Sequence, residues 1–194
     1  MLISIYAHSA RVSLLDRSYY SALNDLSKYY SLLKQSFGRE EKFNSFYLTS
    51  GLYYFFSGYA RERLPLLTPF FYHYALGNKE KGIAYIKLAE LTDDWKINQE
   101  ATYFLMKINF DVKENYTEAA RYCKKLMVIY PENLLFQLYH LRISLGLNRV
   151  NDAKTALSTI RKMAENNVQL TVDERNYYIC NAEAVLAKYQ EKRK

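Results

Sequence analysis

Apolar side chains recur at steps of three and four residues along nearly all of the chain, which places them on one face of an α-helix. Glycine and proline are scarce, with 6 and 3 among 194 residues, so the chain has too few turn residues for a β-sandwich. We therefore predict an all-α fold of about 8–9 helices. The periodic stretches cover residues 2–36, 43–62, 80–91, 100–113, 116–130, 134–146, 150–165 and 172–190.

Turn and capping residues mark the ends of these helices. The first stretch can break at residues 16–18, and Gly38 is placed as a C-cap after it. Residues 92–94 either end one helix or cap the next. Thr171 and Glu174 have the spacing of a capping box, which predicts that the last helix begins at Val172.

The stretch 43–62 is strongly aromatic and contains Gly51 and Gly58 on one helical face. Small residues there would let another helix approach closely. An aromatic run could also surround a flavin or haem, but no phosphate-binding loop and no axial-ligand motif accompanies it. We therefore expect a core helix.

The clearest repeat signal runs from Tyr116 to Pro131. If Pro131 closes a helix–turn–helix unit of about 34 residues, Tyr116 stands at the turn and Ala119 at the small-residue site where two helices cross. Ala153 takes the same small-residue site in the next unit, and Gly82 takes it in the preceding unit after a shift of three residues. The units would cover residues 63–96, 100–133 and 134–167.

This pattern resembles the tetratricopeptide repeat. The resemblance implies one continuous domain, a right-handed superhelix of antiparallel helical hairpins. Residues 1–62 would be an N-terminal helical portion packed on the three hairpins of residues 63–167, and residues 168–194 a C-terminal capping helix with a basic tail. The chain also resembles a bacterial subgroup of tetratricopeptide-like proteins that are often exported and have no known activity. Three stretches carry that likeness: Ser18–Ala22, Ser50–Phe55 and Gly77–Gly82.

The N-terminus bears on where the protein is located. The chain begins without an N-cap, as if inside a helix, and the subgroup likeness implies that a leader is missing. With a leader removed before Met1, the protein would lie in the periplasm or cell envelope, and otherwise in the cytoplasm. No apolar run approaches the roughly 20 residues that span a bilayer, so we expect no transmembrane segment.

The net charge of +7 raises the question of a nucleic-acid partner. The basic residues are scattered, and the only run is Lys192–Lys194. A solvated basic surface explains this distribution better than a binding face, so we do not expect nucleic acid as a partner.

Chemistry-bearing residues are sparse. The histidines His8, His73 and His140 have no partner at a metal-ligand spacing. Cys123 and Cys180 are far apart in the sequence, which favours two buried free thiols over a disulfide. No phosphate loop, nucleophile elbow, zinc-protease or dinucleotide motif occurs. We predict a non-enzymatic protein without a cofactor or metal.

The first helix of each hairpin in such a stack lines a concave face, which is the usual binding surface. The register makes this face apolar and aromatic, without the lysine–asparagine pattern that holds a terminal carboxylate. We expect it to bind a protein or peptide, with Arg142 fixing a carboxylate or carbonyl group. The candidate residues are Phe71, Tyr74, Phe104, Ile108, Tyr139 and Arg142.

Three alternatives remain open for the same surface. The helix at 43–62 or the C-terminal helix could fill it, because large exposed apolar patches are uncommon on monomers. A homodimer could bury it, which would make the protein a structural module. An apolar small molecule could instead lie between the N-terminal helices and the repeats, as in a binding protein of the cell envelope.

Overall fold

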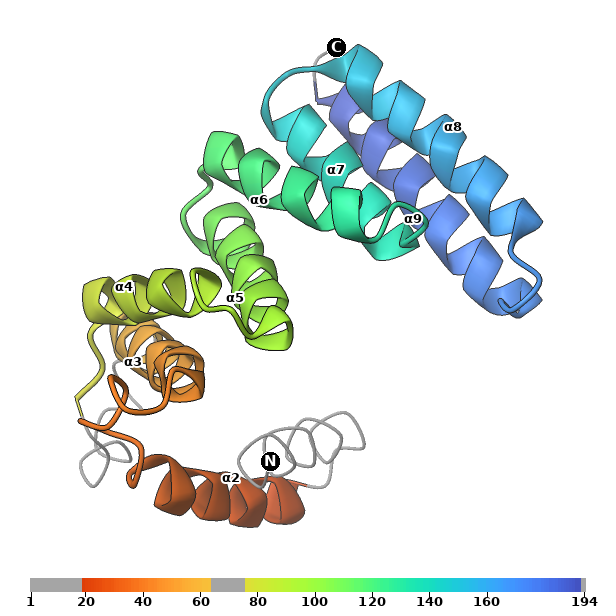
Figure 1. The fold of residues 1–194 in the computed structure, drawn as a ribbon. Coiled ribbons are helices and arrows are strands. Elements are labelled where there is room, and N and C mark those ends of the chain that lie inside the picture. Colours follow the sequence, from red (N-terminus) through yellow and green to blue (C-terminus); the bar gives the residue numbers. More distant parts are fainter. Residues whose placement is uncertain (1–18, 64–75, 193–194) are drawn as a thin grey trace. The chain divides into compact units, whose positions relative to one another are not determined.

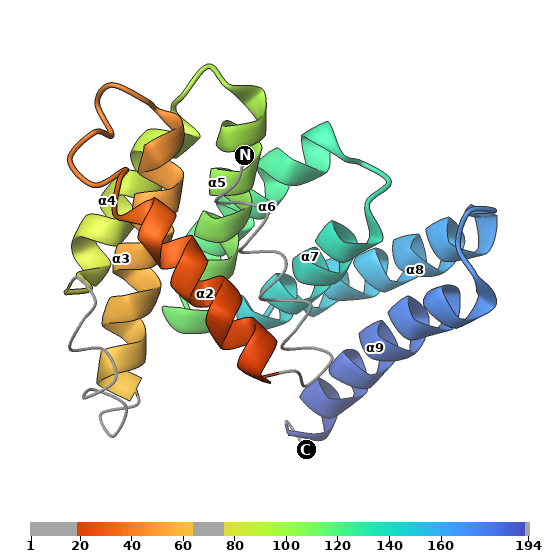
Figure 2. The ribbon, with the colours of Figure 1, turned by 90° about the horizontal axis from the view of Figure 1, so that it is seen from below.

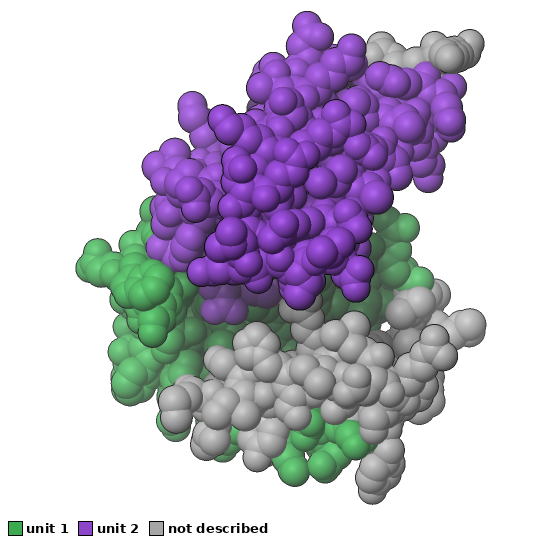
Figure 3. Space-filling view, turned by 90° about the vertical axis from the view of Figure 1, so that its right-hand side faces the viewer, with its two compact units in different colours: residues 1–98 green, residues 99–194 purple. Residues whose placement is uncertain are grey.

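The computed structural model describes residues 19–63 and 76–192, which form eight α-helices and no strand (Figure 1). The prediction of an all-α fold is therefore confirmed. The chain divides into two compact units, residues 1–98 and 99–194 (Figure 3). The helices are α2 (Tyr19–Leu33), α3 (Ser45–Arg63), α4 (Lys79–Glu90), α5 (Trp95–Lys107) with its π-helical continuation η2 (Ile108–Val112), α6 (Tyr116–Ile129), α7 (Leu134–Gly146), α8 (Val150–Asn166) and α9 (Val172–Glu191).

The ends of α6 to α9 agree with the predicted ends to within one residue. Side-chain caps explain the starts of α6, α7 and α9, whereas Arg149, which precedes α8, makes no capping bond with its side chain. Asn115 accepts a hydrogen bond from the backbone N–H of Glu118, and Asn133 accepts from the first turn of α7. The capping box predicted for α9 is present, because Thr171 and Glu174 each bond the backbone N–H of the other.

In the first unit, α3 and α4 approach closely through glycines. A Cβ atom added to Gly82 would lie 2.4 Å from the backbone nitrogen of Phe55, and one added to Gly51 would lie 2.9 Å from Ile86. A Cβ on Gly58 would lie 3.2 Å from the backbone nitrogen of Lys79. The close approach predicted at Gly51 and Gly58 is confirmed, and α4 is the helix that approaches.

The rings of α3 belong to an aromatic cluster within this unit. Tyr53 lies 5.4 Å from Tyr30 and 5.3 Å from Phe37, between ring centroids. The Nζ of Lys81 on α4 lies 4.3 Å from the ring centroid of Tyr54, a cation–π contact. Phe55 is fully buried on the face toward α4. The cluster supports the prediction of a core helix.

The end of α2 differs from its prediction. The helix ends at Leu33, three residues before the expected end at residue 36. The hydroxyl of Ser36 donates to the carbonyl of Leu33 at 2.6 Å, which satisfies one of the last carbonyl groups of the helix. Gly38 then takes a left-handed backbone conformation, with φ of 78°. The predicted break at residues 16–18 lies outside the described residues.

The helix expected at residues 100–113 begins earlier, at Trp95. Asp94 causes this, because its carboxylate accepts hydrogen bonds from the backbone N–H groups of Lys96 (3.0 Å) and Ile97 (3.3 Å). Of the two roles predicted for residues 92–94, the cap of the following helix is therefore present. The apolar spacing alone missed the first turn of α5.

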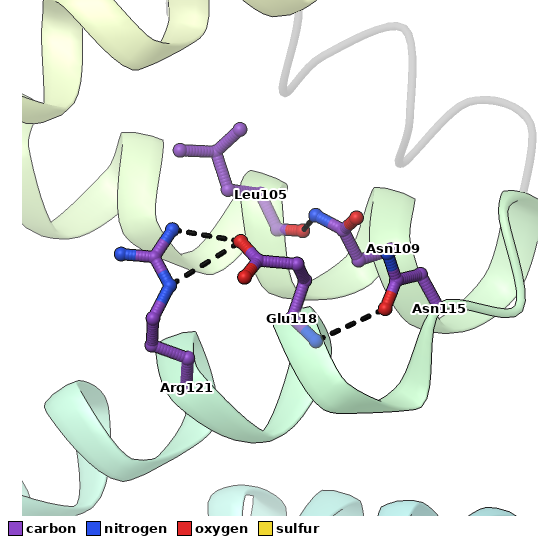
Figure 4. A network of polar contacts seen from close by, with 5 residues as sticks. All are labelled: Leu105, Asn109, Asn115, Glu118 and Arg121. Atoms are coloured by element: carbon purple, nitrogen blue, oxygen red, sulfur yellow. Dashed lines mark hydrogen bonds and ion pairs between the residues drawn. The ribbon is translucent and has the colours of Figure 1, made fainter.

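The end of this helix widens into the π-helix η2. The amide of the buried Asn109 donates to the carbonyl of Leu105 at 2.7 Å (Figure 4). The backbone carbonyl of Asn109 accepts from the backbone N–H of Asn115 at 2.8 Å. Asn115 in turn caps α6, and Glu118 pairs with Arg121 at 2.8 Å. This polar chain joins the end of η2 to the start of α6, which fixes the turn between them.

Helices α7, α8 and α9 lie side by side in the second unit (Figure 2). Their core is aliphatic, and fully buried alanines lie where the helices meet. α9 packs against both α7 and α8. The core residues of these three helices are Leu134, Leu138, Leu141, Leu145, Ala153, Ala156, Leu157, Ile160, Ala164, Ala182 and Leu186.

Candidate functional site

The predicted groove residues do not share one exposed surface. Phe71 and Tyr74 lie outside the described residues. Phe104 is half-buried, but Ile108 and Tyr139 are only 2% and 7% exposed. The expectation that Ile108 and Tyr139 stand open in a groove is therefore wrong.

The surroundings of Tyr139 show why it is buried. Its ring meets the ring of Phe110 edge to face at 5.6 Å, and its hydroxyl accepts from the Nζ of Lys107 at 3.1 Å. Lys107 also pairs with Asp111 at 2.9 Å. Burial works against the charged form of Lys107, but the hydrogen bonds to Asp111 and Tyr139 outweigh it, so the pKa of Lys107 is raised. Tyr139 is therefore part of a packed polar–aromatic cluster.

Arg142 is half-buried and takes part in a contact between α7 and α9. Its Nη2 donates to the amide oxygen of Asn181 on α9 at 2.7 Å. Helix α9 thus covers part of the α7 face that the repeat register predicted to be exposed. The hydrogen bond to Asn181 also orients the guanidinium of Arg142. Positioning Arg142 in this way limits the conformational freedom it would lose on binding a ligand.

A hollow of about 550 Å³ lies beside Arg142, and a second of about 460 Å³ adjoins it along α9. Val185 and Lys188 line both, and we call the two hollows together the α9 trough. The larger hollow is lined by Phe110, Tyr116, Arg142, Leu145, Gly146, Asn148, Val185, Lys188, Tyr189 and Lys192. The smaller one is lined by Tyr177, Cys180, Asn181, Ala184, Val185 and Lys188.

The charges of the α9 trough have one sign. Arg142, Lys188 and Lys192 line it, and none of its described lining residues is acidic. Within the described part of the chain, no carboxylate forms an ion pair with any of these three cations. The charged side chains of the lining are therefore all positive, and a bound anion would find favourable interactions with them.

The aromatic lining is held in place by its own contacts. The ring of Tyr116 lies against Gly146, where an added Cβ would come within 2.6 Å of it. Phe110 meets Tyr116 at 5.9 Å, and the hydroxyl of Tyr189 donates to Asn148 at 2.8 Å. These rings form fixed walls.

The predicted repeat positions differ in burial. Gly82, Ala119 and Ala153 are buried, as expected of small residues at helix crossings. Tyr116 is half-buried beside the start of α6, and Pro131 is exposed after its end. Their spacing as repeat positions stays a prediction.

The two thiols differ. Cys123 is buried, and burial raises the pKa of its thiol to about 12. Cys180 is exposed on α9 and lines the trough, so the prediction of two buried thiols is wrong for it. The face of α9 that carries Cys180 lies away from the core, because the buried positions of that helix are Ala182 and Leu186.

Neither a metal site nor a membrane-spanning helix is found in the described residues. Across residues 19–63 and 76–192, no group of three or more histidine, cysteine or acidic side chains is arranged to hold a metal ion. No helix in these ranges has the length and apolar character needed to cross a membrane.

The trough residues of α9 were missed because the last helix was interpreted only as a cap. A signal was present in its sequence. Tyr177, Cys180, Ala184 and Lys188 recur at three- and four-residue steps, separate from the buried face of the same helix. A second face with a tyrosine and a lysine on a terminal helix can indicate an accessible surface.

Comparisons with known proteins give no relative. No family model matches the chain, and it matches neither a curated protein nor a solved structure.

Proposed function

We propose that the protein is a non-enzymatic helical scaffold that binds a segment of a partner protein in the α9 trough. The observation that carries this proposal is the pair of neighbouring hollows along α9, which share Val185 and Lys188 in their linings. Tyr177, at one end of the trough, is 61% exposed although its ring is large and mostly apolar. A partner side chain that covers it would remove apolar surface from water.

A tetratricopeptide-like stack is the architecture that we propose for this scaffold. Two observations support it. Ala119 and Ala153 occupy equivalent places in consecutive helical pairs, and both are fully buried. In the second unit, α9 packs on both helices of the preceding pair, as the next helix of a stack would. Phe71, Tyr74 and Phe104 remain predicted contacts of the same scaffold.

The length of the trough sets the size of the ligand. α9 rises about 1.5 Å per residue, so the stretch from Tyr177 to Lys192 is about 22 Å long. An extended peptide advances about 3.3 Å per residue and would place about seven residues along it. A linear segment of a protein fits this shape better than a compact small molecule does.

The test is a selection from displayed random peptides of about ten residues against the intact protein, followed by affinity measurements on the selected peptides. Val185→Asp, which places a charge where the two hollows meet, should weaken binding at least about tenfold. The matched control is Ala187→Asp, an exposed position on α9 outside the trough. Circular dichroism of both variants checks that they keep their helices.

Cys180 provides a second measurement on the unmodified chain. A bound peptide should slow alkylation of this exposed thiol, because it lines the trough. The proposal fails if no peptide is selected, or if the selected peptides bind Val185→Asp as well as wild type and leave the alkylation rate unchanged. Sedimentation of the free protein would show whether a second copy occupies the trough instead.

A further inference from the structure

We propose that the segment bound in the α9 trough is acidic, with carboxylates beside Arg142, Lys188 and Lys192 and an apolar side chain toward Tyr177. This inference rests on the proposed function and specifies the chemistry of the partner. It follows from the lining: Arg142 and Lys192 line the larger hollow, Lys188 lines both hollows, and the smaller hollow adds the exposed ring of Tyr177.

The cations at the larger hollow have no carboxylate partner in the described residues. Arg142 is half-buried, so a carboxylate that reaches it would be partly shielded from water and would interact more strongly than a surface pair. The bond from its Nη2 to Asn181 fixes the guanidinium. A planar group held in this way suits a carboxylate oxygen of a ligand.

Two acidic side chains near the trough already have partners. Glu183 of α9 pairs with Arg161 of α8 at 2.6 Å. Asp111, next to the lining residue Phe110, pairs with Lys107 at 2.9 Å. Glu191 adjoins Lys192 in the sequence but is not among the lining residues. The three cations of the lining are therefore available to the carboxylates of a ligand.

The smaller hollow supplies the apolar half of the site. Ala184 and Val185 line it together with the exposed ring of Tyr177. A leucine or aromatic side chain of the partner would cover this surface. The occupant that matches both ends is a peptide with one or two large apolar residues followed by aspartate or glutamate. A phosphodiester backbone matches only the cationic end.

The experiment uses the displayed peptide selection on the intact protein. The selected peptides should be enriched in aspartate and glutamate next to leucine, phenylalanine or tryptophan. The double variant Lys188→Gln and Lys192→Gln should bind a selected peptide about tenfold more weakly, and Arg142→Gln should lose a similar factor. The control is Lys154→Gln, an exposed lysine on α8 that leaves the trough unchanged and should bind as wild type does. The affinity of wild type should fall as salt is raised, and that of the double variant should fall less.

The outcomes separate this inference from the proposed function. If the selected peptides are neutral or basic and bind Val185→Asp more weakly than wild type, the trough remains a binding site, but the proposal of an acidic partner is wrong. Equal affinities of wild type and the double variant for an acidic peptide would also overturn it. A labelled single-stranded oligonucleotide that binds more tightly than the selected peptides, and whose binding is lost in the double variant, would assign the cations to phosphate. Failure to select any peptide would overturn both proposals.

Discussion

Single polar side chains decide where most of the described helices begin. In five of the eight helices, the residue before the first turn accepts a hydrogen bond from a backbone N–H of that turn. These residues are Asn78, Asp94, Asn115, Asn133 and Thr171. A cap acts within three residues of its own position, so its effect can be predicted from the sequence. This explains why the starts of α6, α7 and α9 were predicted correctly. The burial of a side chain depends on residues far along the chain, and there the predictions for Tyr139 and Cys180 failed.

The thiols provide a direct check of burial. An alkylating thiol reagent added to the native protein should modify Cys180 quickly, because this thiol is exposed. It should modify Cys123 only after unfolding, because that thiol is buried and its pKa is raised to about 12. Peptide mapping by mass spectrometry would identify the modified residue. In Cys180→Ser, the fast reaction should disappear. Rapid modification of Cys123 in the native state would contradict the packing of α6.

His140 should make stability depend on pH. Burial lowers the pKa of its half-buried imidazole, and the opposing effect of Asp152 is smaller. The unfolded chain therefore takes up a proton near pH 6.5 before the folded protein does. The free energy of unfolding should fall as the pH drops below about 6.5 and level off below the lowered pKa of the folded state.

His140→Gln separates this effect from the titration of carboxylates. Urea unfolding of wild type and variant at a series of pH values gives the difference in free energy. As the pH falls from about 7 to about 5, the free energy of unfolding of wild type should decrease relative to that of His140→Gln. A difference that stays constant over this range would show that His140 is not shielded from water.

Helix crossings are set by residues that lack a side chain. α3 and α4 meet at Gly51 and Gly82, where added Cβ atoms would collide with backbone atoms. The sequence indicated Gly51 as a close-approach site but did not identify its partner, because helical spacing describes one helix at a time. Gly82 was assigned through the repeat register, and the structure places it directly against the backbone of Phe55.

Substitution of Gly82 tests this crossing. Gly82→Val should lower the free energy of unfolding by about 1–3 kcal/mol. The backbone of Phe55, which the new side chain would meet, cannot move aside without separating α3 from α4. Chemical denaturation measures the change. Gly38→Asn is the control, because no atom lies within 4 Å of an added Cβ there and asparagine tolerates a positive φ. A loss at Gly38 equal to that at Gly82 would argue against steric contact as the cause.

The start of α9 offers a test of the local contribution of a cap. Thr171→Ala removes the side-chain acceptor of the capping box and should cost about 1 kcal/mol of stability. Thr171→Ser keeps the acceptor and should cost less. Hydrogen exchange of the first turn of α9 would locate the change. An equal loss in both variants would point to the methyl group of Thr171 instead of its hydroxyl.

The limits of sequence-based prediction show most clearly in α5 and α9. The apolar pattern missed the first turn of α5, since that turn is held by Asp94 and exposes Trp95. The π-helix depends on the buried amide of Asn109, which no periodic pattern reveals. α9 was predicted with correct bounds, but its contact with Arg142 joins positions 39 residues apart and could not be inferred from either helix alone.

Two compact units within one chain raise the question of whether they unfold together. The second unit has an aliphatic core of its own in α7, α8 and α9, while α3 and α4 meet through glycines in the first. Regions with separate cores can open independently. Ala153 is fully buried in the core of the second unit, so Ala153→Leu should overpack it and cost about 1–3 kcal/mol. Hydrogen exchange should then show faster exchange in α7, α8 and α9, with the amides of α3 and α4 unchanged.

Ala187→Leu, on the exposed side of α9, is the matched control and should leave exchange in both units as in wild type. If Ala153→Leu accelerated exchange equally in α3 and α4, the two units would unfold as one cooperative structure, and the separate core of the second unit would not be enough to stabilise it alone.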